Sequence, residues 1–384
     1  MAPAAGGRAV SGLWEPAQHA FPAERLDDFL VWAAESGASD VAMQTGSPAF
    51  VEVDGKLRRA TSAVLGRTEM EMLVEGLFNE TGVSILRSGE AIDCSKTVQR
   101  DRLRRRRFRV NISPAEVDHA FAVSITLRVM PEAVPTLDEL GIEPEIVSAW
   151  ELCAGLTLVT GIPGSGKSTL LAAGTRRLLE NGSGRIQSFE APIEYVFDGI
   201  GGNAALMSSA EIPRHFSTFA QGLRSSLRRR PAAVLVGEAR DRETVEAVVR
   251  AADYGIAVYS TAHTTGVAAT IRRMLAEFPA EERDERGAAL VDVLHLVVTQ
   301  VLVADPGGGR TALREWLVFD SELKSALLER PQRAWPGTIS DRLADAGTDL
   351  LGAAERAFRE GSMGQSDYRR IRAAAGLQGG RDAR

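Results

Sequence analysis

Residues 161–170 read GIPGSGKSTL, and this glycine-rich stretch constrains the fold more than any other part of the chain. It fits the pattern G-x-x-x-x-G-K-[ST], in which glycines let backbone N–H groups converge on an anion. The chain has only four lysines among 45 basic residues, at Lys56, Lys96, Lys167 and Lys324. A lysine at 167 supplies the compact charge that bridges phosphate oxygens, which the planar arginine fork does poorly. The stretch therefore predicts a phosphate-binding loop.

The sequence on either side of this loop fits the same prediction. LTLVT before it has the pattern of a buried strand, and TLLAAGTRRLLE after it has that of a helix. Further buried strands are expected at 185–190, 233–238 and 257–263, with a helix at 243–255 that Gly255 closes. Strands that alternate with helices predict a doubly wound, mostly parallel sheet, with ligands at the carboxyl ends of its strands.

The preceding part of the chain has a different pattern. Apolar residues at helical spacing (Leu26, Phe29, Leu30 and Ala33) predict a helix over 24–36, and 68–80 resembles another. Alternating stretches predict strands at 41–44, 49–60, 107–112 and 120–129, with a hairpin turn at Asp54–Gly55. We therefore expect five parts, namely a flexible tail (1–22), an α+β domain (23–130), a proline-containing linker (131–140), the α/β domain (141–330) and a helical C-terminal region (331–384).

Composition limits the function classes. The chain of 384 residues has a net charge of −6 and no apolar run near the ~20 residues that a membrane span needs. Cys94 and Cys153 fit neither a disulfide framework nor a zinc cluster, so we expect a cytoplasmic protein. The arginine runs at 102–109 and 223–231 are read as solvated or ion-paired surface. No direct binding of nucleic acid is therefore expected.

Charged and polar side chains stand where the predicted strands end. Glu238 ends AVLVGE, and its carboxylate is a candidate partner for Mg²⁺ or for an attacking water. Glu190 and Glu194 follow another strand and are candidates to orient or deprotonate water. His263, at the end of AVYSTAH, is placed to hydrogen-bond a γ-phosphate. Ser168 would supply a hydroxyl oxygen to Mg²⁺, so ATP and Mg²⁺ are the expected cofactors.

Four ordered motifs then carry a resemblance to a known family. They read GIPGSGKST (161–169), FEAPIEY (189–195), LVGEARD (235–241) and STAHT (260–264). They resemble the phosphate loop, Asp box, Walker-B-like segment and His box of the PilT-type secretion ATPases. The match extends from ASD (38–40) to LVFD (317–320), and AEIPRHFSTFAQGLRSSLRRRP favours the DotB/TraJ branch, which serves type IVB (Dot/Icm) secretion and plasmid conjugation.

The resemblance implies a homohexamer of two-domain subunits, each with an N-terminal PAS-like domain and a RecA-like ATPase domain. It implies recruitment to a secretion or conjugation complex at the cytoplasmic face of the inner membrane. By position it assigns Glu194 as the base of the Asp box, and Arg224 and Arg228 to a helix near the subunit interface. The nucleotide-contacting residues that it implies are Gly161, Ile162, Pro163, Gly164, Ser165, Gly166, Lys167, Ser168, Thr169, Arg109 and Arg128.

Two departures from the family pattern leave alternatives open. Ala191 replaces the aspartate usual after Glu190, and Ala262 replaces the leucine before His263. A lost carboxylate would suit a nucleotide-gated assembly protein that hydrolyses little. A pilus retraction motor is a second alternative. A DNA translocase is a third, against which the net acidity and the lack of interleaved aromatic residues weigh.

Overall fold

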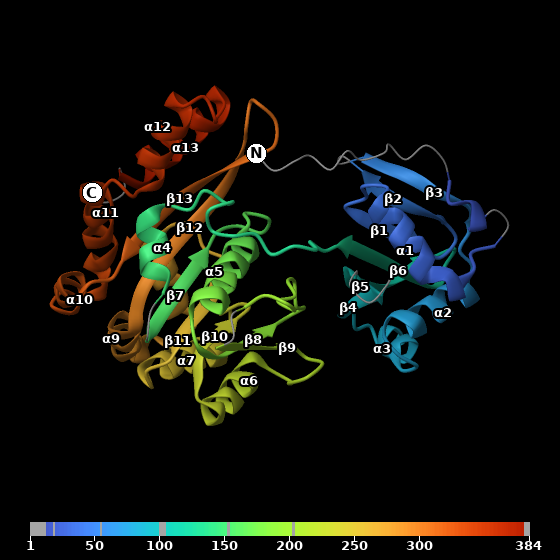
Figure 1. Ribbon diagram of the computed structural model, residues 1–384, viewed down its shortest axis with the longest axis horizontal. Coiled ribbons are helices and arrows are strands. Elements are labelled where there is room, and N and C mark those ends of the chain that lie inside the picture. The colour runs from blue at the N-terminus through green and yellow to red at the C-terminus, as the bar shows by residue number, and fades with distance from the viewer. Residues whose placement is uncertain are drawn as a thin grey trace. The chain divides into compact units, whose positions relative to one another are not determined.

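The computed structural model describes residues 13–17, 20–53, 56–99, 105–151, 154–201 and 204–379. The predicted turn at Asp54–Gly55, Cys153 and residues 102–104 of the first arginine run lie outside these ranges. The chain divides into two compact units, Met1–Ala133 with Ala191–Val196, and Val134–Glu190 with Phe197–Arg384 (Figure 1).

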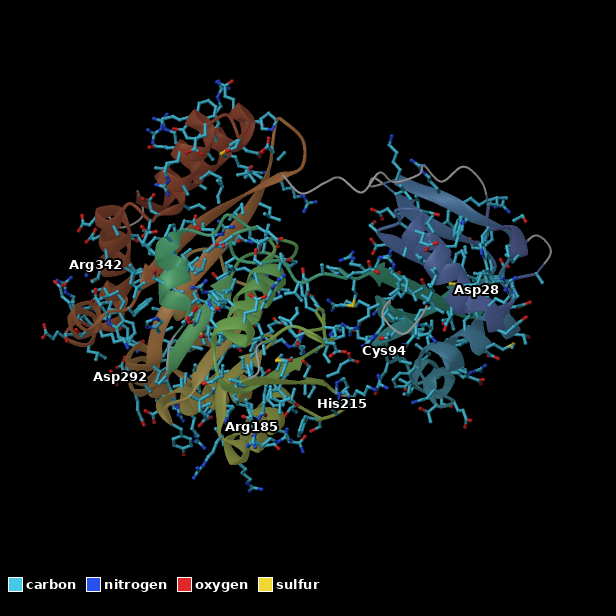
Figure 2. All side chains as sticks on the ribbon, in the orientation of Figure 1. Asp28, Cys94, Arg185, His215, Asp292 and Arg342 are labelled. Atoms are coloured by element: carbon cyan, nitrogen blue, oxygen red, sulfur yellow. The ribbon has the colours of Figure 1, made fainter. Side chains whose placement is uncertain are left out.

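The first unit is an antiparallel sheet with helices. Its strands lie in the order β3-β2-β1-β6-β5-β4. The bounds are β1 Asp40–Gln44, β2 Pro48–Val53, β3 Lys56–Val64, β4 Ile92–Gln99, β5 Arg105–Val117, β6 Ala120–Val129, α1 Leu26–Glu35, α2 Arg67–Leu77 and α3 Gly82–Arg87. The four apolar positions predicted for the first helix are the four that α1 buries, because residues three and four apart share one helix face. Cys94 of β4 is buried, and its thiol lies 3.8 Å from the Leu77 carbonyl (Figure 2).

The second unit contains the predicted parallel sheet. Its strand order is β13-β12-β7-β11-β10-β8-β9, and every neighbouring pair is parallel except β12 with β13. The bounds are β7 Gly155–Thr160, β8 Gly184–Glu190, β9 Ala205–Glu211, β10 Pro231–Val236, β11 Ala257–Ala262, β12 Leu294–Ala304 and β13 Arg310–Val318. The predicted doubly wound, mostly parallel α/β fold is confirmed.

Ten α-helices belong to the described part of this unit. They are α4 Pro144–Trp150, α5 Lys167–Asn181, α6 Phe219–Ser226, α7 Arg242–Asp253, α8 Val267–Ala276, α9 Arg283–Val293, α10 Ser321–Leu328, α11 Trp335–Ala346, α12 Leu350–Arg359 and α13 Gln365–Gly379. Helices α12 and α13 pack on the β12–β13 hairpin around a small apolar cluster of their own. No helix among the described residues is long and apolar enough to cross a membrane.

Helices cover both faces of the parallel sheet. Val258 of β11 shares an apolar core with residues of α7, α8 and α9. The next residue, Tyr259, points to the other face, since side chains alternate along a strand. There its ring stacks on Trp150 with centroids 5.5 Å apart, and its hydroxyl donates to the Trp150 carbonyl at 2.6 Å. A Cβ at Gly174 of α5 would overlap the same indole, so α5 lies on the Tyr259 face.

Several strands were not predicted from the sequence. They are β4, β9, β12 and β13, and the last two extend the parallel sheet by an antiparallel hairpin. Strand β9 is half-exposed at the sheet edge, so its side chains lack the continuous apolar pattern of a buried parallel strand. β12 has that pattern, as LHLVVTQVLVA, with one buried glutamine, Gln300, inside it.

Candidate functional site

The glycine-rich loop occupies the turn between β7 and α5, as its sequence predicts. Gly161 and Gly166 have φ angles of +143° and +84°, which side chains of L-residues rarely allow. A Cβ at Gly166 would stand 2.7 Å from Nε2 of Gln300, and one at Gly161 would overlap the Gln300 carbonyl and the Ser165 hydroxyl. Both glycines are therefore required by conformation and by space. Ile162, Pro163 and Gly164 form the exposed crest of the loop.

Lys167, the first residue of α5, is buried with 7% of its surface exposed. Its Nζ donates to the carbonyls of Gly161 at 2.8 Å and Ile162 at 3.0 Å, and lies 3.3 Å from Nδ1 of His263. These two peptide carbonyls help to hold the ammonium over the loop. Phosphate oxygens, which are charged, form stronger hydrogen bonds with an ammonium than peptide carbonyls do.

Strand register brings His263 and Glu238 to the same place. Thr160 pairs with Ala262 across β7 and β11, so Gly161 and His263 leave the sheet side by side. Glu238 follows the neighbouring strand β10, and its Oε1 lies 3.3 Å from Nε2 of His263. Parallel strands end at one edge of a sheet, and for this reason three residues far apart in sequence meet.

The three side chains form a row from cation to imidazole to carboxylate. The Lys167 ammonium has donors only, so Nδ1 of His263 must accept from it. The proton of a neutral imidazole then resides on Nε2, which donates toward Glu238. The hydrogen bonds of His263 therefore depend on both the position of the Lys167 ammonium and the charge of the Glu238 carboxylate.

Ser168 and Thr169 occupy the first turn of α5 and are half-buried. Among the described residues no cluster of three or more His, Cys, Asp or Glu side chains could hold a metal ion. Mg²⁺ bound with a nucleotide needs only one or two protein oxygens, since phosphates and water supply the rest. The Ser168 hydroxyl and the Glu238 carboxylate, one-quarter exposed, fit that requirement.

The other two candidate carboxylates have separate surroundings. Glu190 is the last residue of β8, and its Oε1 accepts from the Ser188 hydroxyl at 2.7 Å. Glu194 lies in the segment 191–196, which belongs to the first unit. In that unit Oε1 of Glu194 lies 3.9 Å from Nη1 of Arg109. Arg128, on β6, donates from Nε to Asp40 at 2.9 Å.

The two interface arginines implied by the resemblance differ in their surroundings. Arg224 on α6 forms an ion pair with Glu243 at 3.2 Å. Arg228 lies one turn later, in the 3₁₀ turn Leu227–Arg229, and is exposed with no ion pair to any described residue. Of the two guanidinium groups, the one on Arg228 is therefore free of charge compensation within the described chain.

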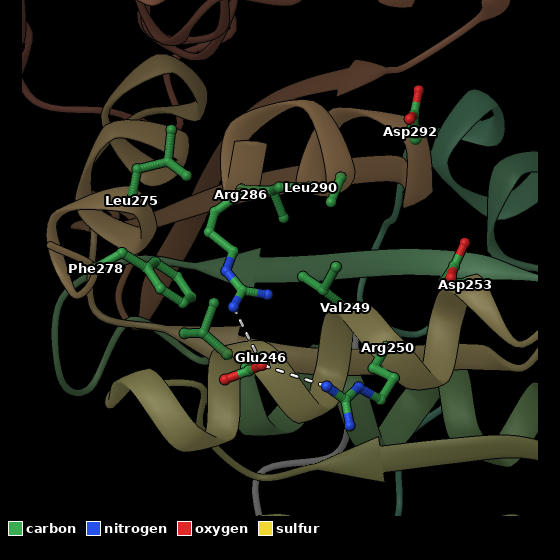
Figure 3. A pocket seen from close by; sticks show the side chains of 11 residues that line it. Glu246, Val249, Arg250, Asp253, Leu275, Phe278, Arg286, Leu290 and Asp292 are labelled. Carbon is green, nitrogen blue, oxygen red and sulfur yellow. Dashed lines mark hydrogen bonds and ion pairs between the residues drawn. The ribbon is translucent and has the colours of Figure 1, made fainter. Parts of the chain in front are cut away.

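A pocket of about 240 Å³ lies away from this site, between α7 and α9 (Figure 3). Glu246 lies in its wall, where Arg250 and Arg286 each contact the carboxylate at 3.4 Å. Phe278 and Leu290 add apolar surface. None of the candidate site residues lines it. Arg286 also pairs with Glu282 at 3.5 Å, and Asp253 and Asp292 line the same pocket, so its two arginine charges are balanced by carboxylates and it offers no anion site.

Two buried residues at the site were not predicted. Gln300 of β12 donates from Nε2 to the Ser165 carbonyl at 2.6 Å, and Arg314 of β13 donates from Nε to Oε1 of Gln300 at 2.9 Å. A glutamine inside the apolar run of β12 is a sequence signal, because buried polar groups need partners. The partner could not be named without the strand order.

Comparison with known proteins gives consistent matches. Residues 97–332 match the family model described as type II/IV secretion system protein. The chain is 33% identical over 304 residues to the type IV pilus retraction ATPase PilT of Pseudomonas aeruginosa, covering 79% of this chain and 85% of that protein. The X-ray structure of the ATPase DotB from Legionella pneumophila superposes with a TM-score of 0.85 at 36% identity, covering 92% of this chain and 97% of DotB. The pilus retraction motor PilT with bound ADP gives 0.77 at 27% identity, covering 89% and 95%.

Proposed function

Since this chain belongs to the type II/IV secretion system protein family, we propose that it is a Mg²⁺-dependent ATPase that converts ATP hydrolysis into conformational work. The observation that carries the proposal is the row of Lys167, His263 and Glu238 beside the phosphate loop. Similarity to a PilT structure that contains ADP supports a nucleotide as the ligand. The loop supplies backbone N–H groups, and the N-terminus of α5 adds its positive dipole end.

The residues of the row would act in order when nucleotide binds. Lys167 would exchange the Gly161 and Ile162 carbonyls for phosphate oxygens. Its departure would free Nδ1 of His263, which could donate to a terminal phosphate oxygen only when it carries a proton of its own. Mg²⁺ held at Ser168 and Glu238 would neutralise phosphate charge. Glu238 would also align a water molecule, and the contact with Nε2–H of His263 would hold its carboxylate in place for this.

Several further residues are proposed to complete the site. Glu194 is the proposed base. Arg109 and Arg128 are the proposed cations that would close on the bound nucleotide. Arg228 rather than Arg224 is the proposed arginine finger, because Glu243 already neutralises Arg224. An unpaired guanidinium is available to stabilise negative charge that develops on a neighbouring subunit's phosphate.

This assignment of the finger is tested with paired alanine variants. Arg228→Ala should lower the catalytic rate constant by about tenfold or more with ATP affinity retained, since a finger acts on the transition state. Arg224→Ala should change that rate by less than about threefold, because its loss removes an exposed ion pair. Equal losses in the two variants would contradict the choice.

The proposed activity is tested by ATP binding and steady-state hydrolysis with and without Mg²⁺. Wild type should bind ATP and release phosphate slowly, since motors of this kind are limited by conformational steps. Lys167→Ala should lose binding, whereas Lys56→Ala, at an exposed position in the first unit, should match wild type. If the two variants behave alike, the phosphate loop is not the nucleotide site.

The biological role is proposed at a finer level. We infer a homohexamer that acts in type IVB secretion or conjugative transfer, recruited from the cytoplasm to the inner-membrane complex. The support is the higher identity and TM-score with the Legionella pneumophila DotB structure than with the ADP-bound PilT structure. Analytical ultracentrifugation tests the ring. Complementation tests the role, in one strain that lacks its DotB-type ATPase and in another that lacks PilT. Rescue of effector secretion supports it, and rescue of pilus retraction alone contradicts it.

Two alternatives keep specific support. A retraction motor is favoured by the 33% identity with PilT over 79% of the chain. A nucleotide-gated assembly protein that hydrolyses little is favoured by Ala191, which stands where a second carboxylate is usual. Restoring that carboxylate with Ala191→Asp discriminates between a motor and a gate. A large gain in hydrolysis favours the gate, and an unchanged rate favours a motor that uses Glu194.

A further inference from the structure

A buried hydrogen bond controls the direction of one peptide unit in the phosphate loop. Nε2 of Gln300 donates to the Ser165 carbonyl at 2.6 Å, and both residues are at most 4% exposed. The Ser165 carbonyl and the Gly166 N–H belong to one planar trans peptide and point in opposite directions. Holding the carbonyl against β12 therefore directs the Gly166 N–H away from the sheet hairpin, toward the side where the loop's anion would lie.

The orientation of the Gln300 amide is set in turn by Arg314. Nε of Arg314 donates to Oε1 of Gln300 at 2.9 Å, so the amide must present its NH₂ group to Ser165. Arg314 is 4% exposed, and burial lowers the pKa of its guanidinium while the carboxylate of Glu143 raises it. The guanidinium remains charged in any case, since arginine does not deprotonate in proteins.

The remaining donors of Arg314 bind the segment that precedes α4. We name residues 134–143 the connector, because they join the first unit to α4. Nη2 donates to the Leu140 carbonyl at 3.2 Å, and Nη1 donates to the Gly141 carbonyl at 3.2 Å and to Glu143 at 3.1 Å. A side chain with four hydrogen bonds, all directed to one loop and one glutamine, is fixed in position.

A second arginine ties the same segment to the nucleotide-binding helix. Arg176 of α5 donates from Nη1 to the Val134 carbonyl at 2.6 Å. Both ends of the connector are therefore bound to the elements that hold the phosphate loop, one end through α5 and the other through β13 and β12. A change of the loop would be transmitted to the connector through these buried, hydrogen-bonded groups.

We propose that Gln300 and Arg314 are positioning residues that fix the anion-binding form of the phosphate loop and couple it to the connector. The identity of the anion as a nucleotide phosphate rests on the proposed function. The order is Ser165, Gln300, Arg314, connector, and we name this set the loop relay. Because each member hydrogen-bonds the next, a substitution of Gln300 should release the phosphate loop only. A substitution of Arg314 should release both the phosphate loop and the connector.

Hydrogen exchange of the full-length protein without nucleotide tests this order. Gln300→Met keeps the side-chain length and removes the amide, so exchange in 161–168 should rise about tenfold, while that of 138–143 stays within about twofold. Arg314→Lys keeps the positive charge but lacks the planar guanidinium group, so hydrogen exchange should rise in both 161–168 and 138–143. Gln187→Met is the matched control, because Gln187 is also a buried glutamine of the same sheet. It should leave both peptides unchanged.

Nucleotide affinity gives the second readout. ADP should bind Gln300→Met about tenfold more weakly than wild type, the loss expected when one buried hydrogen bond is removed. The catalytic rate constant at saturating ATP should stay within about threefold, since the loop contacts substrate and transition state alike. Gln187→Met should bind ADP as wild type does. The melting temperature of each variant separates a local effect from a loss of folded protein.

The outcomes separate the loop relay from the ATPase proposal. If wild type binds no ADP but the exchange pattern appears, the function is wrong and the loop relay stands. If wild type binds ADP and Gln300→Met matches Gln187→Met in both readouts, the loop relay is overturned. Exchange that rises throughout the second unit in step with a lower melting temperature would also overturn it, since Gln300 would then serve stability alone.

Discussion

Gly174, in the middle of α5, gives a prediction in which two familiar effects oppose each other. Replacing a helical glycine by alanine normally stabilises a protein by about 0.5–1 kcal/mol, because glycine has more backbone freedom in the unfolded chain. Here the new Cβ would overlap Cε2, Cζ2 and Nε1 of the Trp150 indole. That ring is fully buried and stacked on Tyr259, so it has no open space to enter.

The magnitude follows from comparing the two effects. Overpacking of a filled core costs about 1–3 kcal/mol or more. Overlap with three ring atoms belongs at the upper end of that range, so the net change for Gly174→Ala is about 2 kcal/mol of destabilisation after the helical gain is subtracted. For a unit of this size that corresponds to a melting temperature lower by roughly 4–8 °C.

Thermal unfolding measures this directly, with Gly337→Ala as the control. Gly337 lies in the first turn of α11, and a Cβ there would meet no atom within 4 Å. The same substitution should therefore raise the melting temperature slightly at Gly337 and lower it at Gly174. A neutral or stabilised Gly174→Ala would refute the packing of α5 against Trp150, and with it the assignment of α5 to the Tyr259 face.

Two other predictions concern stability. Glu315 accepts from the backbone N–H groups of Val267 at 2.7 Å and Leu350 at 3.3 Å, and burial raises the pKa of its carboxyl above 4.5. The folded state therefore holds that proton more tightly, and the free energy of unfolding of wild type relative to Glu315→Gln should fall as pH rises above about 4.5. Urea unfolding from pH 4 to 8 checks this, and a difference that grows with pH would contradict it. Asp241 caps α7 by accepting from the Thr244 N–H at 2.9 Å, so Asp241→Ala should cost about 1 kcal/mol in the same assay, and no loss would contradict the cap.

The elements nearest the phosphate loop could be predicted because their signals are local. The pattern from Gly161 to Ser168 specifies its own turn, and continuous apolar runs define the strands beside it. The meeting of Lys167, His263 and Glu238 follows from one general rule, that ligands bind where parallel strands end. Neighbouring strands β7, β11 and β10 satisfy that rule.

Other features depend on register between distant segments. Gln300 reaches Ser165 across 135 residues of sequence, and Arg314 reaches Leu140 across 174. No local pattern encodes which strand lies beside β7, so the loop relay could not be predicted without the strand order of the sheet. Strand β9 was missed for another reason, since an edge strand lacks the burial pattern by which buried strands are recognised.

The proposed ATPase activity requires that Glu238 supports hydrolysis of a nucleotide held at Lys167. A single-turnover experiment tests it most directly, with wild type and Glu238→Gln mixed with limiting ATP and Mg²⁺ after binding is measured in each. ATP occupancy should be equal in the two proteins, and phosphate release should be at least about a hundredfold slower in Glu238→Gln, since a water-aligning group acts on the chemical step. Equal rates at equal occupancy would contradict it and would leave a nucleotide-gated assembly protein as the better description.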